Sequence, residues 1–388
     1  MKRRRIVVLG TMGCEPYAGV AWREMQFARG LDRLGHDVYY LETTSTWPYD
    51  PVRRTRVGDS NYAVPYVRRV AESFGFAGRW GYRRSYGDKE WFGLSRAAAE
   101  DLLANADAVL SVGGSTRLAE EDLKAGRLVY IGTDPVVHEI PFANGDEEIR
   151  TLIEEHHDLV TYGENIGTPD CPLPPLPGLR ARTRQPIVLD AWQDGQPTKE
   201  EFTTVGNWRQ EGFDTHYRGE TYYWSKHHEY LKFIDLPLRI RQPIELATGL
   251  VQLCLDERRL LESNGWRLID AHAFTNDPWP YRDYVRASRG EFTVAKDANV
   301  RLRTGWFSER SCCYLAAGRP VITQDTGFGE VLPTGQGLFP FNSMEEILAA
   351  FEAIRSDYGR HSRAARVIAE EYFKAEKVLA KLLNDLGI

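Results

Sequence analysis

Short apolar runs that alternate with helical patterns constrain the fold of this sequence more than any other feature. The first run, Ile6-Val-Val-Leu-Gly10, is β-branched and ends in glycine, as buried parallel strands often do. A helical pattern follows, with its apolar residues on one face and Gly35 placed as its C-cap. Residues 36–42 form a second apolar run. Together these segments predict one βαβ unit.

The same pattern recurs along the first half of the chain. Strands are predicted at 106–114, 128–134 and 158–163. Ligands of open α/β sheets bind at the carboxyl ends of the strands, so we expect Gly13, Gly114, Asp134 and Glu164 to border one cleft. A nicotinamide dehydrogenase would need Gly-x-Gly-x-x-Gly after the first strand, and the glycines here have another spacing.

A Pro-rich stretch at 168–186 is predicted to be a linker. The chain has 388 residues, which at about 150 residues per domain predicts two or three domains. Strands are predicted beyond the linker at 187–192, 202–208, 266–271 and 291–295, and helices at 243–255 and 281–288. We expect an α/β fold with two Rossmann-like domains, at 1–180 and 181–360. A helical segment at 361–388 is expected to pack back on the first domain.

The segment 305–330 is the most informative. Ser308 is a plausible N-cap for a helix that runs to Ala317 and ends at Gly318. A strand at 320–323 and the loop Asp325-Thr-Gly follow. The N-terminus of a helix can hold a diphosphate, so we expect Arg310 and the N–H groups of Ser311 and Cys312 to bind one.

Two sequences in this segment, Leu315-Ala-Ala-Gly318-Arg-Pro-Val321 and Gly327-Phe-Gly-Glu330, resemble the donor-binding signature of GT-B glycosyltransferases. The likeness is greatest to bacterial family-4-like enzymes, whose N-terminal opening is similar to Leu31-Asp-Arg-Leu-Gly-His-Asp-Val38. The resemblance implies two Rossmann-like domains facing across a cleft. It also implies transfer of a sugar from a nucleoside-diphosphate donor, such as a UDP-sugar. Asp325, Thr326 and Gly327 resemble the loop that bonds the hydroxyls of the donor sugar.

The chain departs from that family at one motif. The family carries two glutamates separated by seven residues, and the corresponding positions here are Gly305 and Cys313. Glu309 is the acid that could substitute, and we include it among the donor-binding candidates. No convincing Asp-x-Asp motif occurs, so we expect no metal and no cofactor besides the nucleotide sugar. Basic groups and helix dipoles would stabilise the leaving diphosphate.

Further site residues are expected on both sides of the cleft. Lys296 and Arg209 each follow a predicted strand of the second domain, and Gly13 would let the first-domain backbone approach the phosphates. Asp134, His138 and Glu15 are candidates for a catalytic base, and the sequence does not choose among them.

The segment 47–92 is rich in Trp, Tyr and Arg. Its aromatic residues could stack on an acceptor, and Arg79, Arg83 and Arg84 could meet an anionic one. The acceptor would be a small molecule or a group presented by an acidic carrier protein.

Composition narrows the alternatives. The net charge is −6, which disfavours non-specific binding of nucleic acid, although residues 51–96 hold ten Lys or Arg against four Asp or Glu. No apolar run suits a membrane helix or a signal peptide, so we expect a cytoplasmic protein. The five cysteines include no Cys-x-x-Cys pair, so the sequence indicates neither a disulfide framework nor a zinc site.

Two alternative hypotheses for the function are a nucleotide-sugar epimerase of the same architecture and a non-catalytic sugar-nucleotide binding protein.

Overall fold

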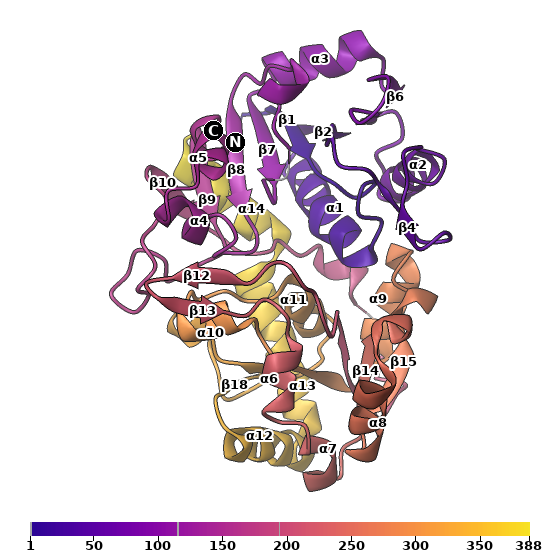
Figure 1. Ribbon diagram of the computed structural model, residues 1–388, viewed down its shortest axis with the longest axis vertical. Coiled ribbons are helices and arrows are strands. Elements are labelled where there is room, and N and C mark those ends of the chain that lie inside the picture. The colour runs from indigo at the N-terminus through magenta and orange to yellow at the C-terminus, as the bar shows by residue number, and fades with distance from the viewer. Residues whose placement is uncertain (1, 115, 194) are drawn as a thin grey trace.

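The structure is a computed structural model that describes residues 2–114, 116–193 and 195–388. Two largely parallel sheets with helices packed on them confirm the predicted α/β fold class. They form two domains, one above the other in Figure 1. In the described part of the chain, no helix is long and apolar enough to cross a membrane.

The first sheet has the strand order β10-β9-β8-β7-β1-β2-β5-β6, parallel except for β6. Its strands are β1 (Arg5–Leu9), β2 (Asp37–Glu42), β5 (Trp80–Arg83), β6 (Trp91–Gly93), β7 (Ala108–Val112), β8 (Leu128–Gly132), β9 (Asp158–Thr161) and β10 (Leu179–Arg182). Its helices are α1 (Ala18–Arg33), α2 (Ala63–Ser73), α3 (Arg96–Asn105), α4 (Glu139–Ala143) and α5 (Glu147–Glu154). Ile6 and Val8 share a core with α1, and Val7 and Leu9 share one with α3. Both faces of the sheet are therefore covered, as the alternation of side chains along a strand requires.

The second sheet has the order β15-β14-β11-β16-β17-β18 and is parallel throughout. Its strands are β11 (Phe202–Val205), β14 (Ile244–Thr248), β15 (Arg267–Asp270), β16 (Gly290–Thr293), β17 (Val321–Gln324) and β18 (Leu338–Phe341). Its helices are α6 (His227–Leu231), α7 (Leu236–Arg239), α8 (Leu255–Ser263), α9 (Pro278–Ala287), α10 (Asp297–Arg301) and α11 (Glu309–Ala316). Two hairpins, β3–β4 (Tyr49–Asp50 and Thr55–Arg56) and β12–β13 (Thr215–Tyr217 and Glu220–Tyr222), lie outside the sheets.

Three predicted elements were wrong. Residues 243–255 begin as strand β14, because Ile244–Thr248 pairs with strands on both sides and is buried throughout. Residues 187–192 contain a 3-10 turn at Leu189–Ala191, and Ile187 makes an isolated bridge to Lys374. The stretch 168–186 is not all linker, since it supplies β10 at the edge of the first sheet.

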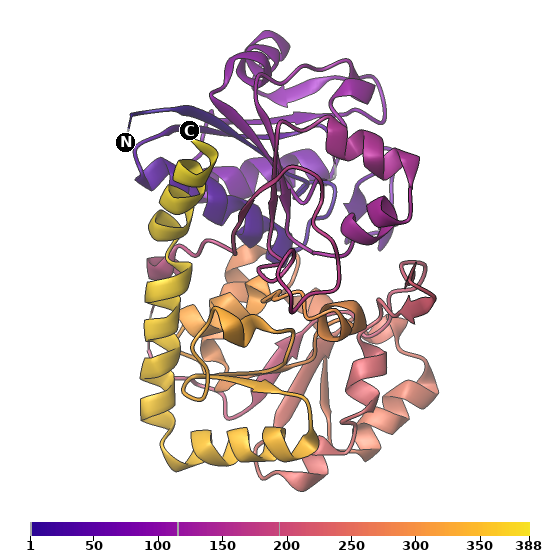
Figure 2. The same cartoon turned by 90° about the vertical axis from the view of Figure 1, so that its left-hand side faces the viewer.

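The C-terminal helices return to the first domain. They are α12 (Met344–Ser356), α13 (Tyr358–Ile368), a π-helical turn at Ala369–Phe373 and α14 (Ala375–Leu386). In Figure 2 the last helices, in yellow, run along one side of the molecule from the lower domain to the upper. A Cβ on Gly30 of α1 would lie 2.8 Å from the Cβ of Ala375, so glycine there allows the two helices to approach closely.

The loop after β1 is filled by carboxylates of this same chain. Thr11 N and Met12 N donate to Glu24, and Gly13 N and Cys14 N donate to Glu42 at 2.8 and 2.7 Å. The Tyr40 hydroxyl lies 2.8 Å from Glu24 and 3.1 Å from Glu42. Burial, followed by the charge of Glu24, raises the pKa of Glu42 to about 8. The N–H groups expected to meet phosphates are thus already occupied.

This raised pKa predicts how the stability of the protein depends on pH. Glu42 binds a proton more tightly in the folded chain than in the unfolded one, so its contribution is complete below about pH 4.5 and is lost as the pH rises through about 8. We expect Glu42→Gln to flatten this part of the stability curve, whatever it does to absolute stability. Urea unfolding across that range measures the slope. Glu211→Gln is the control, because Glu211 is exposed. A slope that Glu42→Gln leaves unchanged would refute the assignment.

Arg310 fixes the beginning of α11 to two neighbouring strands. Its Nε donates to Glu291 Oε1 at 2.5 Å, its Nη1 to the Val205 carbonyl at 2.6 Å and its Nη2 to Thr293 Oγ1 at 2.7 Å. The Glu291 side chain is 0% exposed and that of Arg310 is 12% exposed. Charge-assisted bonds of this kind orient the guanidinium rigidly.

Removing one partner of this pair should be costly. We expect Arg310→Met to lower the free energy of unfolding by about 3–5 kcal/mol, because it leaves the Glu291 carboxylate buried without a partner. Arg310→Met combined with Glu291→Gln should recover a large part of that loss. Urea denaturation checks both variants. Equal stability of the single and double variants would contradict this account.

Candidate active site between the two domains

A cavity of about 280 Å³ lies between the two domains. Arg23 of α1 and Thr133 and Asp134, which follow β8, line it from the first domain. The second domain contributes residues after β11, after β16 and at the start of α11. They are Gly206, Asn207, Gln210, Trp224, Lys226, Lys296, Trp306, Ser308, Glu309 and Arg310. The cavity thus lies at the carboxyl ends of strands from both sheets, where α/β folds bind ligands.

Four cationic side chains meet in this cavity, from Arg23, Lys226, Lys296 and Arg310, against two lining carboxylates, from Asp134 and Glu309. Each of the three guanidinium nitrogens of Arg310 donates one hydrogen bond to another residue of the chain. Since a guanidinium has five N–H donors, two remain for a ligand. Three of the four cations have a carboxylate partner, Arg23 with Glu24, Lys296 with Asp134 and Arg310 with Glu291. Unpaired Lys226 and the remaining N–H groups of Arg310 are suited to an anion with several oxygens.

Lys226 has the least compensated charge of the four. No hydrogen bond or ion pair joins its Nζ to any described residue, and its contact is with the ring of Trp306 at 6.0 Å. Burial, reinforced by the charges of Arg310 and Lys296, lowers the pKa of Lys226 to about 7. Sequence reasoning missed this residue, because the three-residue strands of the hairpin before it and the five-residue helix α6 after it are too short to show a spacing pattern.

Asp134 and Lys296 join the two domains across the cavity. Lys296 Nζ donates to Asp134 Oδ2 and lies 3.1 Å from the ring centroid of Trp224. Burial lowers the pKa of Lys296, and the Asp134 carboxylate opposes that shift. Asp134 Oδ1 is buried and has no partner among the described residues. Trp306 Nε1 donates to the Thr133 carbonyl at 3.1 Å, a second bond between the domains.

Of the expected donor residues, Lys296, Glu309 and Arg310 line the cavity, and the others do not. Gly13 N bonds Glu42, and Arg209 pairs with Glu257. Cys312 N donates to the Ser308 carbonyl within the helix, so that N–H is not free as expected. Ser311 Oγ is buried and has no partner among the described residues.

The loop at 325–327 contacts the first domain and does not line the cavity. Asn165 Nδ2 donates to the Gly327 carbonyl at 3.0 Å, and Thr326 Oγ1 donates to the Trp306 carbonyl at 2.5 Å. Asp325 accepts from Gly327 N at 2.8 Å and from Arg303 at 3.2 Å. The loop therefore helps to position Trp306 and the domain interface.

Asp134 is the one base candidate that lines the cavity. His138 Nδ1 lies 2.6 Å from the Tyr130 hydroxyl, and burial lowers the pKa of His138 to about 4. Glu15 is paired with Arg56 on the other side of the first-domain loop. Neither is placed to take a proton in the cavity.

The three arginines expected to bind an acceptor are not brought together. Arg83 is buried against Glu121, Arg79 pairs with Asp32, and Arg84 pairs with Asp88 and Glu90. Each guanidinium has its carboxylate partner within the same domain. Arg23, which sequence reasoning did not select, is the first-domain cation that reaches the cavity.

No family model and no curated protein matches the sequence. Solved structures do match. An α-glucosyltransferase in complex with UDP and a 13-mer DNA matches with a TM-score of 0.58 and 10% identity, over 100% of both chains. A glycosyltransferase from Rickettsia africae matches with a TM-score of 0.54 and 12% identity, over 99% of this chain and 98% of the other. Anabaena HepE, in complex with UDP-glucose, matches with a TM-score of 0.54 and 11% identity, over 99% and 100%.

At these identities the comparisons bear on architecture. Their matches extend over both domains and over nearly the full length of each chain. Together with the two parallel sheets, they confirm the predicted fold: the chain has the GT-B architecture of two Rossmann-like domains that face a common cleft.

Proposed function

We propose that this protein is a glycosyltransferase that moves a sugar from a UDP-sugar to an acceptor hydroxyl. The observation that carries the proposal is the meeting of Arg23, Lys226, Lys296 and Arg310 in one cavity between the domains. UDP and UDP-glucose are bound by two of the structurally similar glycosyltransferases, which supports the choice of donor.

The diphosphate would lie against Lys226, Lys296 and Arg310. Cleavage of the bond between sugar and diphosphate leaves its electron pair on a phosphate oxygen, so negative charge grows there. Cations held in place in a largely buried cavity stabilise this charge without having to reorganise. They would do so without a metal.

Asp134 would act as the base in a single displacement. Its Oδ2 is bonded to Lys296, and its buried Oδ1 has no partner among the described residues. A diphosphate that draws Lys296 to itself would weaken this bond and increase the basicity of Asp134. Oδ1 could then accept the proton of the acceptor hydroxyl as its oxygen attacks the anomeric carbon.

The acceptor would enter from the side of the first domain, where Arg23 and Asp134 face the cavity. Either a small molecule or a group tethered to a carrier protein fits this route. Glu309 reaches the cavity from the opposite side and would contact the sugar or the ribose of the donor.

Lys226 gives the donor site a dependence on pH. The diphosphate of UDP-glucose is ionised throughout the neutral range, whereas Lys226 loses its proton as the pH rises through about 7. We expect UDP-glucose to bind more tightly at about pH 6 than at about pH 8, since only protonated Lys226 attracts the diphosphate. Lys226→Met should weaken binding roughly tenfold at the lower pH and flatten the pH dependence. Titration calorimetry measures both effects.

Lys377→Met is the matched control, because this lysine is half exposed and lies outside the cavity. It should bind UDP-glucose as the unaltered protein does. Equal affinity of Lys226→Met and the unaltered protein at both pH values would contradict the assignment of the diphosphate site.

Substitution of Asp134 should affect catalysis without weakening the binding of UDP-glucose. We expect Asp134→Asn to reduce kcat for release of UDP from UDP-glucose by about 10²–10⁴-fold, because the amide cannot accept a proton. Affinity for UDP-glucose should be kept or increased, since Lys296 loses a competing carboxylate. Steady-state kinetics and calorimetry give the two values. A protein that binds UDP-glucose but never cleaves it, with water or with any acceptor offered, would be a binding protein instead.

A further inference from the structure

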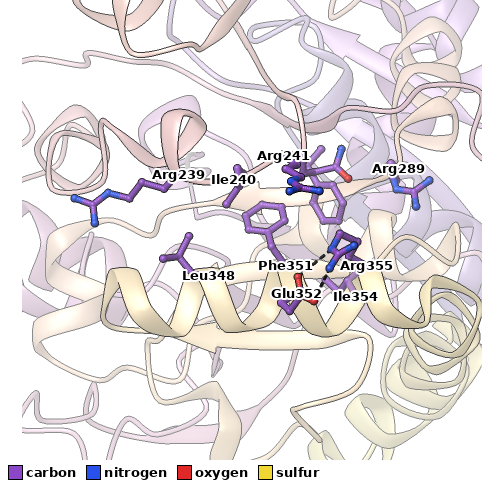
Figure 3. Close-up of a pocket in the computed structure, with 11 residues that line it drawn as sticks. Arg239, Ile240, Arg241, Arg289, Leu348, Phe351, Glu352, Ile354 and Arg355 are labelled. Carbon is purple, nitrogen blue, oxygen red and sulfur yellow. Dashed lines mark hydrogen bonds and ion pairs between the residues drawn. The ribbon is translucent and has the colours of Figure 1, made fainter.

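A second cavity, of about 540 Å³, lies on the second domain away from the cleft. It borders Phe202, where β11 begins, and Arg289, just before β16. The donor cavity lies at the other ends of these strands, beyond Val205 and Thr293. Figure 3 shows Arg239, Arg241, Arg289 and Arg355 around it, with Phe351 of α12 below Arg241.

The lining carries four arginines and one glutamate, a net charge of +3. Arg355 is bonded to that glutamate, Glu352, at 2.6 Å, and Arg239 to Asp235 at 2.6 Å. Arg289 stacks on the ring of Tyr358 at 4.3 Å and has no carboxylate partner among the described residues. Arg241 has neither an ion pair nor a side-chain hydrogen bond within the part of the chain described. Two guanidinium groups are therefore free to bind an anion.

The inner wall of this cavity is apolar. Phe202, Ile354 and Phe351 are 1%, 2% and 6% exposed, and Ile240 and Leu348 are partly buried beside them. The apolar surface that a ligand can reach is therefore mainly that of Ile240 and Leu348, over the buried phenylalanines. A ligand here would place an apolar body against this surface and an anionic group against the arginines. The volume lies within the roughly 300–1,000 Å³ that is usual for small-molecule sites.

We propose that this cavity binds a phosphate monoester carried on an apolar body. Arg241, Arg289 and Arg355 all line the cavity, and in the view of Figure 3 they appear to the right of Arg239. A phosphate monoester offers three oxygens to planar guanidinium groups, which bind such oxygens in pairs. The proposal is independent of the donor site, since the two cavities share no residue.

Phenyl phosphate is the probe, and titration calorimetry measures its affinity. We expect Arg241→Gln, and more strongly Arg241→Gln with Arg289→Gln, to weaken binding at least roughly tenfold. Arg241 is exposed, its charge acts on Glu352, and Arg241→Gln removes no ion pair or side-chain hydrogen bond among the described residues, so the fold should persist. Arg96→Gln is the control, because Arg96 is 76% exposed on the first domain.

Three results would contradict the proposal or part of it. Absent binding, or binding that the Arg241 and Arg289 variants leave unchanged, overturns the proposal. Binding lost in Lys226→Met would place the probe in the donor cavity and also overturns it. Inorganic phosphate that binds as tightly as phenyl phosphate refutes the role of the apolar wall.

Vesicles containing phosphatidic acid, compared with phosphatidylcholine vesicles, distinguish the source of the phosphate. Binding to phosphatidic acid that is lost in the double variant identifies a lipid headgroup. Binding of phenyl phosphate without binding to those vesicles identifies a soluble ester. Vesicle binding that persists in the double variant, with no phenyl phosphate bound, overturns the proposal.

Discussion

The buried pairing of Arg310 with Glu291 holds the proposed donor site together. One guanidinium joins the start of α11 to the ends of β11 and β16 through Glu291, the Val205 carbonyl and Thr293. Because these bonds satisfy part of the guanidinium and no more, the remaining N–H groups stay available at the cavity. The same residue is therefore part of the fold and part of the ligand surface.

In the first domain, the loop after the first strand of the sheet has no free N–H groups to offer to a ligand. There the loop after β1 directs its N–H groups to Glu24 and Glu42, so the chain itself supplies the acceptor oxygens. A phosphate at that loop would have to displace buried carboxylates. Arg23 precedes Glu24 and is bonded to it at 2.9 Å, and it still lines the cavity. The first domain thus offers the cavity one cation, while the second domain supplies Lys226, Lys296 and Arg310.

Lys296 and Arg310, beside elements with a recognisable pattern, could be predicted from the sequence, whereas Lys226, the N-cap of the five-residue helix α6, could not. Lys296 and Arg310 were selected because they follow a recognisable strand and begin a recognisable helix, observed at Glu309–Ala316. The sequence did not indicate Lys226 as a site residue, because the short hairpin before it has no periodic pattern. The prediction for Cys312 was wrong by one position, because only the N–H groups from the N-cap Ser308 to Ser311 lack a partner within the helix, and Cys312 N already donates to Ser308.

Long-range contacts account for the other differences between the elements predicted from the sequence and those in the structure. Ile244–Thr248 forms a strand because β11 and β15 flank it, which no local pattern shows. The partner of Arg83, Glu121, lies 38 residues away in the sequence, so an arginine-rich segment looked more exposed than it is. The two-domain fold itself rests on repeated strand–helix alternation, a signal spread over the whole chain and robust to such local errors.

A crystal structure with UDP bound tests the central claim most directly. The account predicts the diphosphate in the cavity between the domains, with oxygens within hydrogen-bond distance, about 3 Å, of Lys226 Nζ, Lys296 Nζ and Arg310. It also predicts that the bond between Lys296 and Asp134 is longer than in the empty cavity. A diphosphate bound at the loop after β1, or in the arginine-lined cavity of the second domain, would contradict it.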